Sequence, residues 1–283
     1  ISNVILPCGD YVGLFGSCYK ATVKNLKLSF GKEGCFDTDN KVDNYAGGTF
    51  VGVSLGTTIE NCETIRTTDV TKIYTEKAAG GIVGYAGGGT VLKNCINNLD
   101  VVSEKNEKAG GLVGCAQDGN LSTADNVGLG ITIEGCTNNG NVESKASGTE
   151  RVGGLVTYTD NVITFKGLNK FTGTLTQNGN TKVQSVANLN NGSIVLAADA
   201  TFQVPADYKT VNQKAVDGLF FATVADGVAT LVKNSAAVAG ANLKVMAPGA
   251  TIALANVGDS ITLDETLATA TVTTVPANWI SKS

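Results

Sequence analysis

The chain of 283 residues contains no histidine. Without an imidazole it has no Ser–His or Cys–His nucleophile pair, no His-ligated zinc and no histidine general base. Its Arg residues are few, Arg66 and Arg151, and its net charge is -4, which argues against a surface that binds phosphate or nucleic acid. No apolar run approaches the roughly 18 residues that a membrane-spanning helix requires, so we expect no membrane insertion.

The chain is rich in glycine instead. It has 35 Gly against four Pro, it is 42% hydrophobic, and only 16% of its residues are charged. This composition excludes collagen, disorder and a coiled coil. The length permits one elongated domain or two compact ones, and either would bury a substantial core.

Two sequence blocks recur five times. The first is rich in Gly and stands at 11–16, 46–52, 79–84, 109–114 and 152–157. The second follows each copy, at 23–26, 59–62, 92–95, 133–136 and 165–168. Consecutive second blocks begin roughly 32 to 41 residues apart, which is typical of repeat architectures. Because the units contain β-branched runs and Gly or Asn turns without helical periodicity, we predict an all-β, right-handed parallel β-helix with three short strands per coil.

In such a solenoid, equivalent residues of adjacent coils lie about 4.8 Å apart, so each position of the second block should form a stack. The first and fourth positions are predicted to face the core: Val23, Ile59, Leu92, Ile133 and Phe165, then Leu26, Cys62, Cys95, Cys136 and Leu168. The second position alternates in charge, which favours an exposed stack: Lys24, Glu60, Lys93, Glu134 and Lys166. The third position predicts a corner with left-handed dihedral angles: Asn25, Asn61, Asn94, Gly135 and Gly167.

All seven cysteines lie in the first half of the chain: Cys8, Cys18, Cys35, Cys62, Cys95, Cys115 and Cys136. Their odd number leaves at least one outside any intramolecular disulfide set, and no CxxC pair occurs. Cys62, Cys95 and Cys136 replace Leu in an inward stack, and we interpret them as small buried hydrophobes. The spacing of adjacent coils also permits a disulfide between them, and Cys8, Cys18 and Cys35 could pair among themselves.

The composition changes near residue 200, after which no Cys or Arg occurs. From Leu243 the chain repeats every nine residues, each unit reading as a strand and a turn. We therefore divide the chain at this point into 1–199 and 200–283. The second region either continues the solenoid or forms a separate antiparallel β-domain.

The first region resembles a known family. The Gly-Gly-Leu-Val-Gly block at 110–114 resembles the GLUG motif. So do the Asn-Cys pairs at 61–62 and 94–95 and the Asn-Asn-Gly-Asn turn within 136–141. This motif is found in large bacterial surface proteins, among them non-catalytic parts of IgA-cleaving metallopeptidases. The resemblance covers residues 1 to 170 and is weaker in the fifth copy, where Thr157 replaces the closing Gly. It implies a secreted or cell-surface module of structural or adhesive function, without catalytic residues.

The chain starts at Ile1, almost inside its first repeat, and no signal-peptide pattern is present. The ends of a solenoid expose unpaired backbone edges and are normally capped. We expect a fragment of a longer protein, or ends that another chain covers.

Three functions compete. A surface adhesin or scaffold would bind a glycan or a host or matrix protein through the inserts at 31–44, 120–131 and 144–150. A filament or surface-layer subunit would bind copies of itself. A carbohydrate-active β-helix needs paired carboxylates, or a bound cation with a basic residue, and this chain scatters its Asp and Glu singly. We favour the first function, and expect neither catalytic residues nor a cofactor.

An acidic loop is the one candidate metal site. Asp37, Asp39, Asn40 and Asp43 carry the hard oxygen atoms that calcium prefers. The register of an EF-hand is absent, which favours an ordinary turn. We therefore predict no bound metal.

Overall fold

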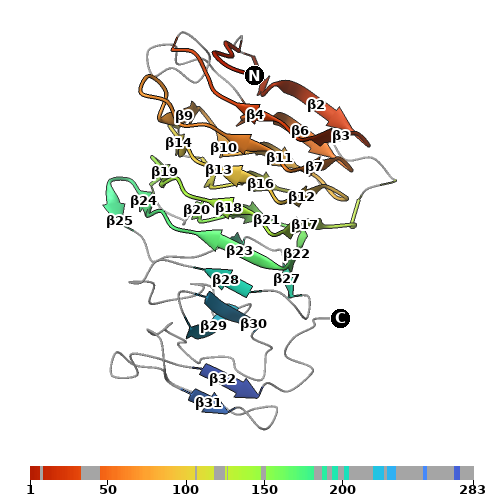
Figure 1. The fold of residues 1–283 in the computed structure, drawn as a ribbon, viewed down its shortest axis with the longest axis vertical. Coiled ribbons are helices and arrows are strands. Elements are labelled where there is room, and N and C mark those ends of the chain that lie inside the picture. Colours follow the sequence, from red (N-terminus) through yellow and green to blue (C-terminus); the bar gives the residue numbers. More distant parts are fainter. Residues whose placement is uncertain are drawn as a thin grey trace.

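The computed structural model describes residues 1–6, 9–32, 45–105, 107–117, 125, 127–147 and 151–181, and several short strands beyond them. Within these ranges the chain is all-β and contains no helix. Most strands stack in parallel along one axis, with the N-terminus at one end of the stack (Figure 1). The predicted parallel β-helix is thereby confirmed. No helix long and apolar enough to cross a bilayer occurs in the described part of the chain.

The stack consists of five sheets. Sheet I contains β1 (Tyr11–Val12), β5 (Ala46–Gly48), β10 (Ala78–Gly80), β15 (Ala109–Gly110) and β20 (Val152–Gly153). Sheet II contains β2 (Phe15–Tyr19), β6 (Val51–Leu55), β11 (Val83–Ala86), β16 (Val113–Ala116), β21 (Val156–Thr159) and β26 (Ala187–Leu189). Sheet III contains β3 (Thr22–Lys24), β7 (Thr58–Glu60), β12 (Val91–Lys93), β17 (Ile131–Glu134), β22 (Val162–Lys166) and β27 (Ser193–Leu196).

The last two sheets complete each coil. Sheet IV contains β4 (Lys27–Leu28), β8 (Glu63–Thr64), β13 (Ile96–Asn97), β18 (Thr137–Asn138), β23 (Leu168–Phe171) and β28 (Thr201–Gln203). Sheet V contains β9 (Lys72–Thr75), β14 (Asp100–Ser103), β19 (Val142–Ser144) and β24 (Leu175–Gln177). The expectation of three strands per coil is therefore wrong. A coil such as 78–103 contains five, because bends divide it into shorter segments, two of them at Gly89 and Asn94, which have positive φ.

The parallel pattern changes toward the C-terminus. The strand β25 (Asn180–Thr181) pairs antiparallel with β24, and the hairpin of β29 (Leu219–Ala225) and β30 (Val228–Lys233) pairs antiparallel with β28. A separate pair, β31 (Thr251–Ala253) and β32 (Thr271–Thr274), is parallel. Most of the nine-residue repeats lie outside the described residues, so the division at residue 200 stays a prediction.

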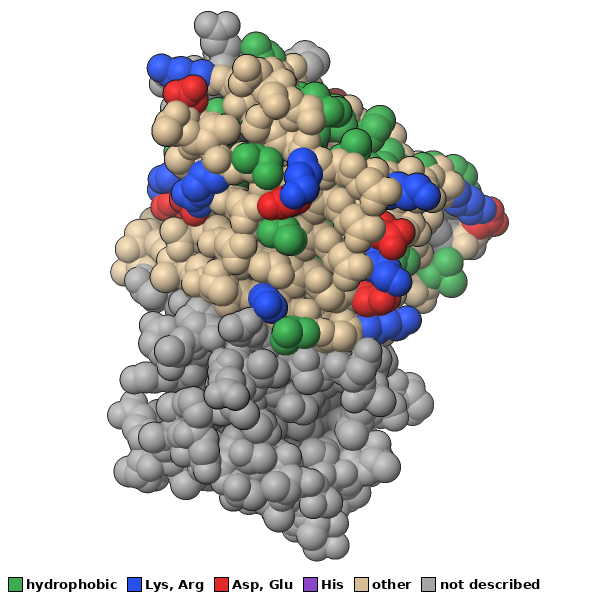
Figure 2. Space-filling model, viewed as in Figure 1, with side chains coloured by type: hydrophobic (Ala, Val, Ile, Leu, Met, Phe, Trp, Pro, Cys, Tyr) green, Lys and Arg blue, Asp and Glu red, His purple; other side chains and the backbone are tan. Residues whose placement is uncertain are grey.

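The strand register confirms two of the predicted stacks in sheet III. Val23, Ile59, Leu92, Ile133 and Phe165 pair in succession and are buried. Their neighbours from Lys24 to Lys166 pair in the predicted alternation of charge, and Lys93 Nζ lies 3.1 Å from Glu134 Oε1. Basic and acidic side chains alternate down the right-hand side of the molecule in Figure 2, where sheet III lies.

The corner between sheets III and IV follows the third predicted stack. Its five members, from Asn25 to Gly167, have φ between 51° and 62°. The Asn side chains hydrogen-bond along the stack: Asn61 Nδ2 donates to Asn25 Oδ1 at 3.1 Å, and Asn94 Nδ2 donates to Asn61 Oδ1 at 3.3 Å. Asn therefore tolerates the left-handed turn and also links adjacent coils.

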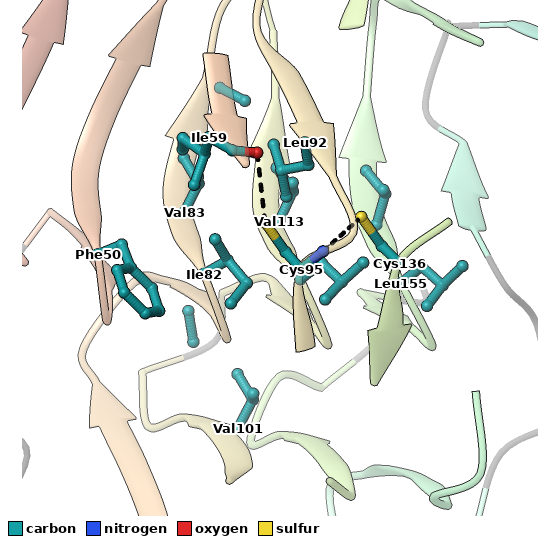
Figure 3. Packing of buried hydrophobic residues seen from close by; sticks show 14 of the residues in the cluster. Phe50, Ile59, Ile82, Val83, Leu92, Cys95, Val101, Val113, Cys136 and Leu155 are labelled. Atoms are coloured by element: carbon teal, nitrogen blue, oxygen red, sulfur yellow. Dashed lines mark hydrogen bonds between the residues drawn. The ribbon is translucent and has the colours of Figure 1, made fainter. Parts of the chain in front are cut away.

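The fourth stack contains one error of prediction. Cys62, Cys95 and Cys136 are buried in the core, as expected. Figure 3 shows Cys95 and Cys136 among their neighbours. However, Thr137 pairs with Lys170, which places Asn169 rather than Leu168 opposite Cys136. Leu168 is 37% exposed. An extra residue after Gly167 shifts the fifth coil by one position, which turns Leu168 outward because side chains alternate along a strand.

Candidate functional site

Sheets I and II fold back on each other so that their outer faces touch. Ala79 and Val83 belong to the main core, and Gly84 and Gly114 lie against the backbone of sheet I. A Cβ built on Gly84 would lie 2.6 Å from Gly47 N, and one on Gly114 would lie 2.6 Å from Ala79 C. The closing Gly of the first block is therefore required by the close approach of two backbones.

Another Gly of the same block faces inward. A Cβ on Gly81 or Gly111 would collide with the side chain of Asn97 or Asn138. These two Asn are fully buried, and Asn97 Nδ2 donates to Asn138 Oδ1 at 2.9 Å. Gly84 and Gly114 thus let sheets I and II approach each other, and Gly81 and Gly111 leave room for a buried stack of Asn side chains.

Beyond the glycine contact, a second apolar cluster fills the space between the outer faces of sheets I and II. This outer cluster is separate from the main core, and its buried members are Ala46, Val53, Ala78, Tyr85 and Cys115. Tyr11, Leu55 and Tyr158 pack against it and are partly exposed. We call the residues that surround the outer cluster its rim. They rest on the packed apolar side chains of the cluster.

Aromatic rings and cations meet at two places on this rim. At the first, Tyr45 is 45% exposed, Tyr11 packs edge-on against it with ring centroids 6.0 Å apart, and Lys77 Nζ lies 5.4 Å from its centroid. At the second, the ring of Tyr158 lies 4.1 Å from Lys108 Nζ and 5.3 Å from Arg151 Cζ. We call these the Tyr45 station and the Tyr158 station. Both use the attraction between a cation and an aromatic face.

The Tyr158 station also carries a carboxylate and a strained backbone. Glu107 Oε2 lies 3.2 Å from Arg151 Nη1 and 3.6 Å from Lys108 Nζ, so it separates two like charges. Tyr158 itself has a φ of 47°. This conformation is rare for a bulky residue, costs on the order of 1 kcal/mol, and recurs at functional sites. Strain of this kind marks the station as a candidate site.

The thiols that the structure describes lie in surroundings that disfavour the reactive thiolate. Burial raises the pKa of the Cys115 thiol to about 12, and contact with the neighbouring thiols together with burial raises the pKa of Cys62 and Cys95 above the usual range. Cys95 N donates to Cys136 Sγ at 3.4 Å, and Cys95 Sγ contacts Ile59 O at 3.3 Å (Figure 3). All five described cysteines are free thiols.

These surroundings predict slow alkylation. We expect iodoacetamide to modify the partly buried Cys18 at least about tenfold faster than Cys95, because the reactive thiolate of Cys95 is neither formed nor accessible. Peptide mass spectrometry of the native protein measures both rates, and the difference should vanish in urea. Equal native rates would contradict the buried Cys stack.

The structure leaves the predicted loop sites untested. Most of the insert at 31–44, half of the insert at 120–131, the end of the insert at 144–150, and Asp37, Asp39, Asn40 and Asp43 lie outside the described residues. So do Cys8 and Cys35. Among the residues that are described, no three His, Cys, Asp or Glu side chains group closely enough to hold a metal ion.

The outer cluster and its two stations were missed by the sequence prediction. A signal was available, because an aromatic or charged residue immediately precedes each strand of sheet I from β5 onward: Tyr45, Lys77, Lys108 and Arg151. The fold-back that makes these positions part of a surface is not visible in the sequence.

A comparison of the chain with family models, curated proteins and solved structures found no match.

Proposed function

We propose that this chain is a non-catalytic, secreted or cell-surface repeat module that acts as an adhesin or structural scaffold. The resemblance to the GLUG motif favours this function. The observation that carries it is the rim of the outer cluster, where exposed and partly exposed aromatic and charged side chains rest on sheets that pair coil by coil. Recognition by such a surface needs no catalytic group.

The stacked coils support the scaffold part of the proposal. Each described coil hydrogen-bonds to the next in several sheets, and the Asn corner and the Lys–Glu stack add contacts along the same direction. Residues held in this way keep their spacing, which suits a rod that presents side chains to a partner.

One experiment separates this function from the carbohydrate-active alternative. The purified chain is incubated with a panel of polysaccharides and matrix proteins, and both binding and the release of reducing ends are measured. We expect binding to at least one member of the panel without release of reducing ends. Release in proportion to protein concentration would overturn the proposal and favour the enzyme.

Self-assembly is a second candidate, favoured by the first coil. Phe15 pairs with the core residue Val51 but is 42% exposed, and Tyr19 of the same strand and Ile5 near the N-terminus are also exposed. Apolar side chains and strand edges that are open together favour association with another chain. Light scattering over a wide concentration range, with negative-stain electron microscopy, tests this: growing rods support self-assembly, and a constant monomer mass contradicts it.

A further inference from the structure

The first coil leaves two strand edges open at the N-terminal end of the solenoid. The strands β2 and β3 are the end members of sheets II and III, and no described residue pairs with their outer edges. The chain covers the neighbouring edge, that of β4 in sheet IV, by itself. Ile1 N donates to Lys27 O at 2.8 Å, and Val4 N donates to Ser29 O at 2.9 Å. The open edge is therefore confined to a definite part of the first coil.

The outer edge of β3 carries backbone groups that are ready to pair. Thr58 N of the second coil donates to Ala21 O at 2.9 Å, so the backbone groups of Ala21 face the second coil. These groups alternate in direction along a strand, and those of Thr22 and Lys24 therefore face away from the second coil. An edge of this kind is a template for another strand.

Two side-chain stacks also end at this edge. Phe15 begins the core stack that continues with Val51 and Val83, which are fully buried, whereas Phe15 is 42% exposed. Asn25 begins the corner stack. Its Oδ1 accepts from Asn61 Nδ2 at 3.1 Å, but its own Nδ2 has no hydrogen-bond partner among the residues that are described. Apolar side chains gather at this end of the molecule in Figure 2, so a further coil would cover exposed apolar surface.

The charges of sheet III select the coil that fits. Lys24 is the exposed end of the Lys–Glu stack, and it has no ion pair within the described part of the chain. Every neighbouring pair of this stack, as far as Lys166, joins opposite charges. Opposite charges favour cross-strand pairing and like charges oppose it, so the next member should be acidic. A second copy that docked sheet III against sheet III through this end would instead bring two Lys24 side chains together.

The third coil shows which strand such an edge accepts. Its strand β12 carries Leu92 and Lys93 where β3 carries Val23 and Lys24, and Asn follows in both. The edge of β12 that corresponds to the open edge of β3 is filled by β7, which places Glu60 opposite Lys93. In sheet II, β6 fills the corresponding edge of β11. The segment 50–61, which contains β6 and β7, is therefore the pattern for the missing coil.

We propose that the open edge of β2 and β3 binds a β-solenoid coil of a partner polypeptide, with strands parallel to β2 and β3 and an acidic residue opposite Lys24. The partner coil covers Phe15 with an apolar side chain and accepts the amide hydrogen bond of Asn25. This proposal goes beyond the adhesive function, because it concerns the end of the solenoid and not the rim of the outer cluster.

Fluorescence anisotropy with the full chain tests the proposal. The probe is a labelled peptide with the sequence of residues 50–61. We expect saturable binding of this peptide, and binding on the order of fivefold weaker for the peptide variant Glu60→Lys. With the protein variant Lys24→Gln, this preference should disappear. No binding of either peptide, or equal binding of both by the unmodified chain, would overturn the proposal.

Two substitutions of Thr22 separate strand pairing from folding. Thr22→Pro removes an N–H that faces away from the second coil, and Pro is tolerated at the first residue of a strand, which Thr22 is in β3. Thr22→Ala is the matched control, because it keeps the N–H. We expect Thr22→Pro to weaken binding of the peptide at least about tenfold and Thr22→Ala to leave it unchanged, with similar unfolding midpoints by circular dichroism. Equal binding by the two folded variants would show that the peptide does not pair with this edge.

The same samples distinguish the other occupants of the edge. Light scattering without the peptide reports association between copies of this chain. A monomeric chain that binds the Glu60 peptide supports the proposal, whereas a chain that dimerises through this end and does not bind the peptide overturns it. Failure to bind any polysaccharide or matrix protein would overturn the adhesive function and leave this proposal standing.

Discussion

Replacement of Gly114 by alanine is expected to lower the free energy of unfolding by about 3 kcal/mol, the upper part of the range for overpacking. Its new Cβ would lie 2.6 Å from both Ala79 C and Ala79 O and 2.8 Å from Ala79 N. These are backbone atoms of β10, which hydrogen bonds hold on both sides of the sheet, so they cannot rotate away as a side chain would. Urea unfolding followed by circular dichroism measures the loss.

The control is another Gly→Ala change in the same chain. A Cβ on Gly9 meets nothing within 4 Å, so Gly9→Ala is expected to change stability by less than about 0.5 kcal/mol. If Gly114→Ala were equally mild, the outer faces of sheets I and II would not be in backbone contact. The explanation of the Gly-rich block would then be wrong.

Replacement of Asn138 by alanine is expected to cost about 3 kcal/mol of unfolding free energy, because it leaves several buried polar groups without partners. The Asn138 side chain accepts from Asn97 Nδ2 at 2.9 Å and from Gly140 N at 3.1 Å. It donates to the carbonyl oxygens of Gly140 and Gly154, both at 3.0 Å. All of these contacts are buried, and water cannot replace the missing amide. The midpoint of chemical unfolding checks the expected loss.

The neighbouring Asn139 is the matched control. It has the same side chain and a comparable bond, from its Nδ2 to Asn98 Oδ1 at 2.8 Å, but it is exposed. Asn139→Ala should therefore cost about 0.5 kcal/mol, since water takes over the released groups. Similar losses for the two variants would show that burial does not set the energy of the Asn138 network.

The repeat alone was sufficient to predict much of the fold. Aligning the second block identified the core stack from Val23 to Phe165, the alternation of Lys and Glu, and the Asn and Gly corner. The strand register confirms the first two, and the φ angles confirm the corner. The alignment failed at Leu168, because a single added residue reverses which side chains face inward. An insertion of this size is invisible when only a short block is compared.

Composition and repetition by themselves determined the architecture, because identical units must stack in the same register and place like residues in like surroundings. They also determined that Cys62, Cys95 and Cys136 stand in the core. Only the tertiary structure decided the fold-back of sheets I and II, the buried amide stack and the outer cluster with its two stations. These features depend on how closely two backbones approach each other across a bend. The sequence shows where the Gly residues stand, but not which neighbouring atoms occupy the space that a side chain would fill.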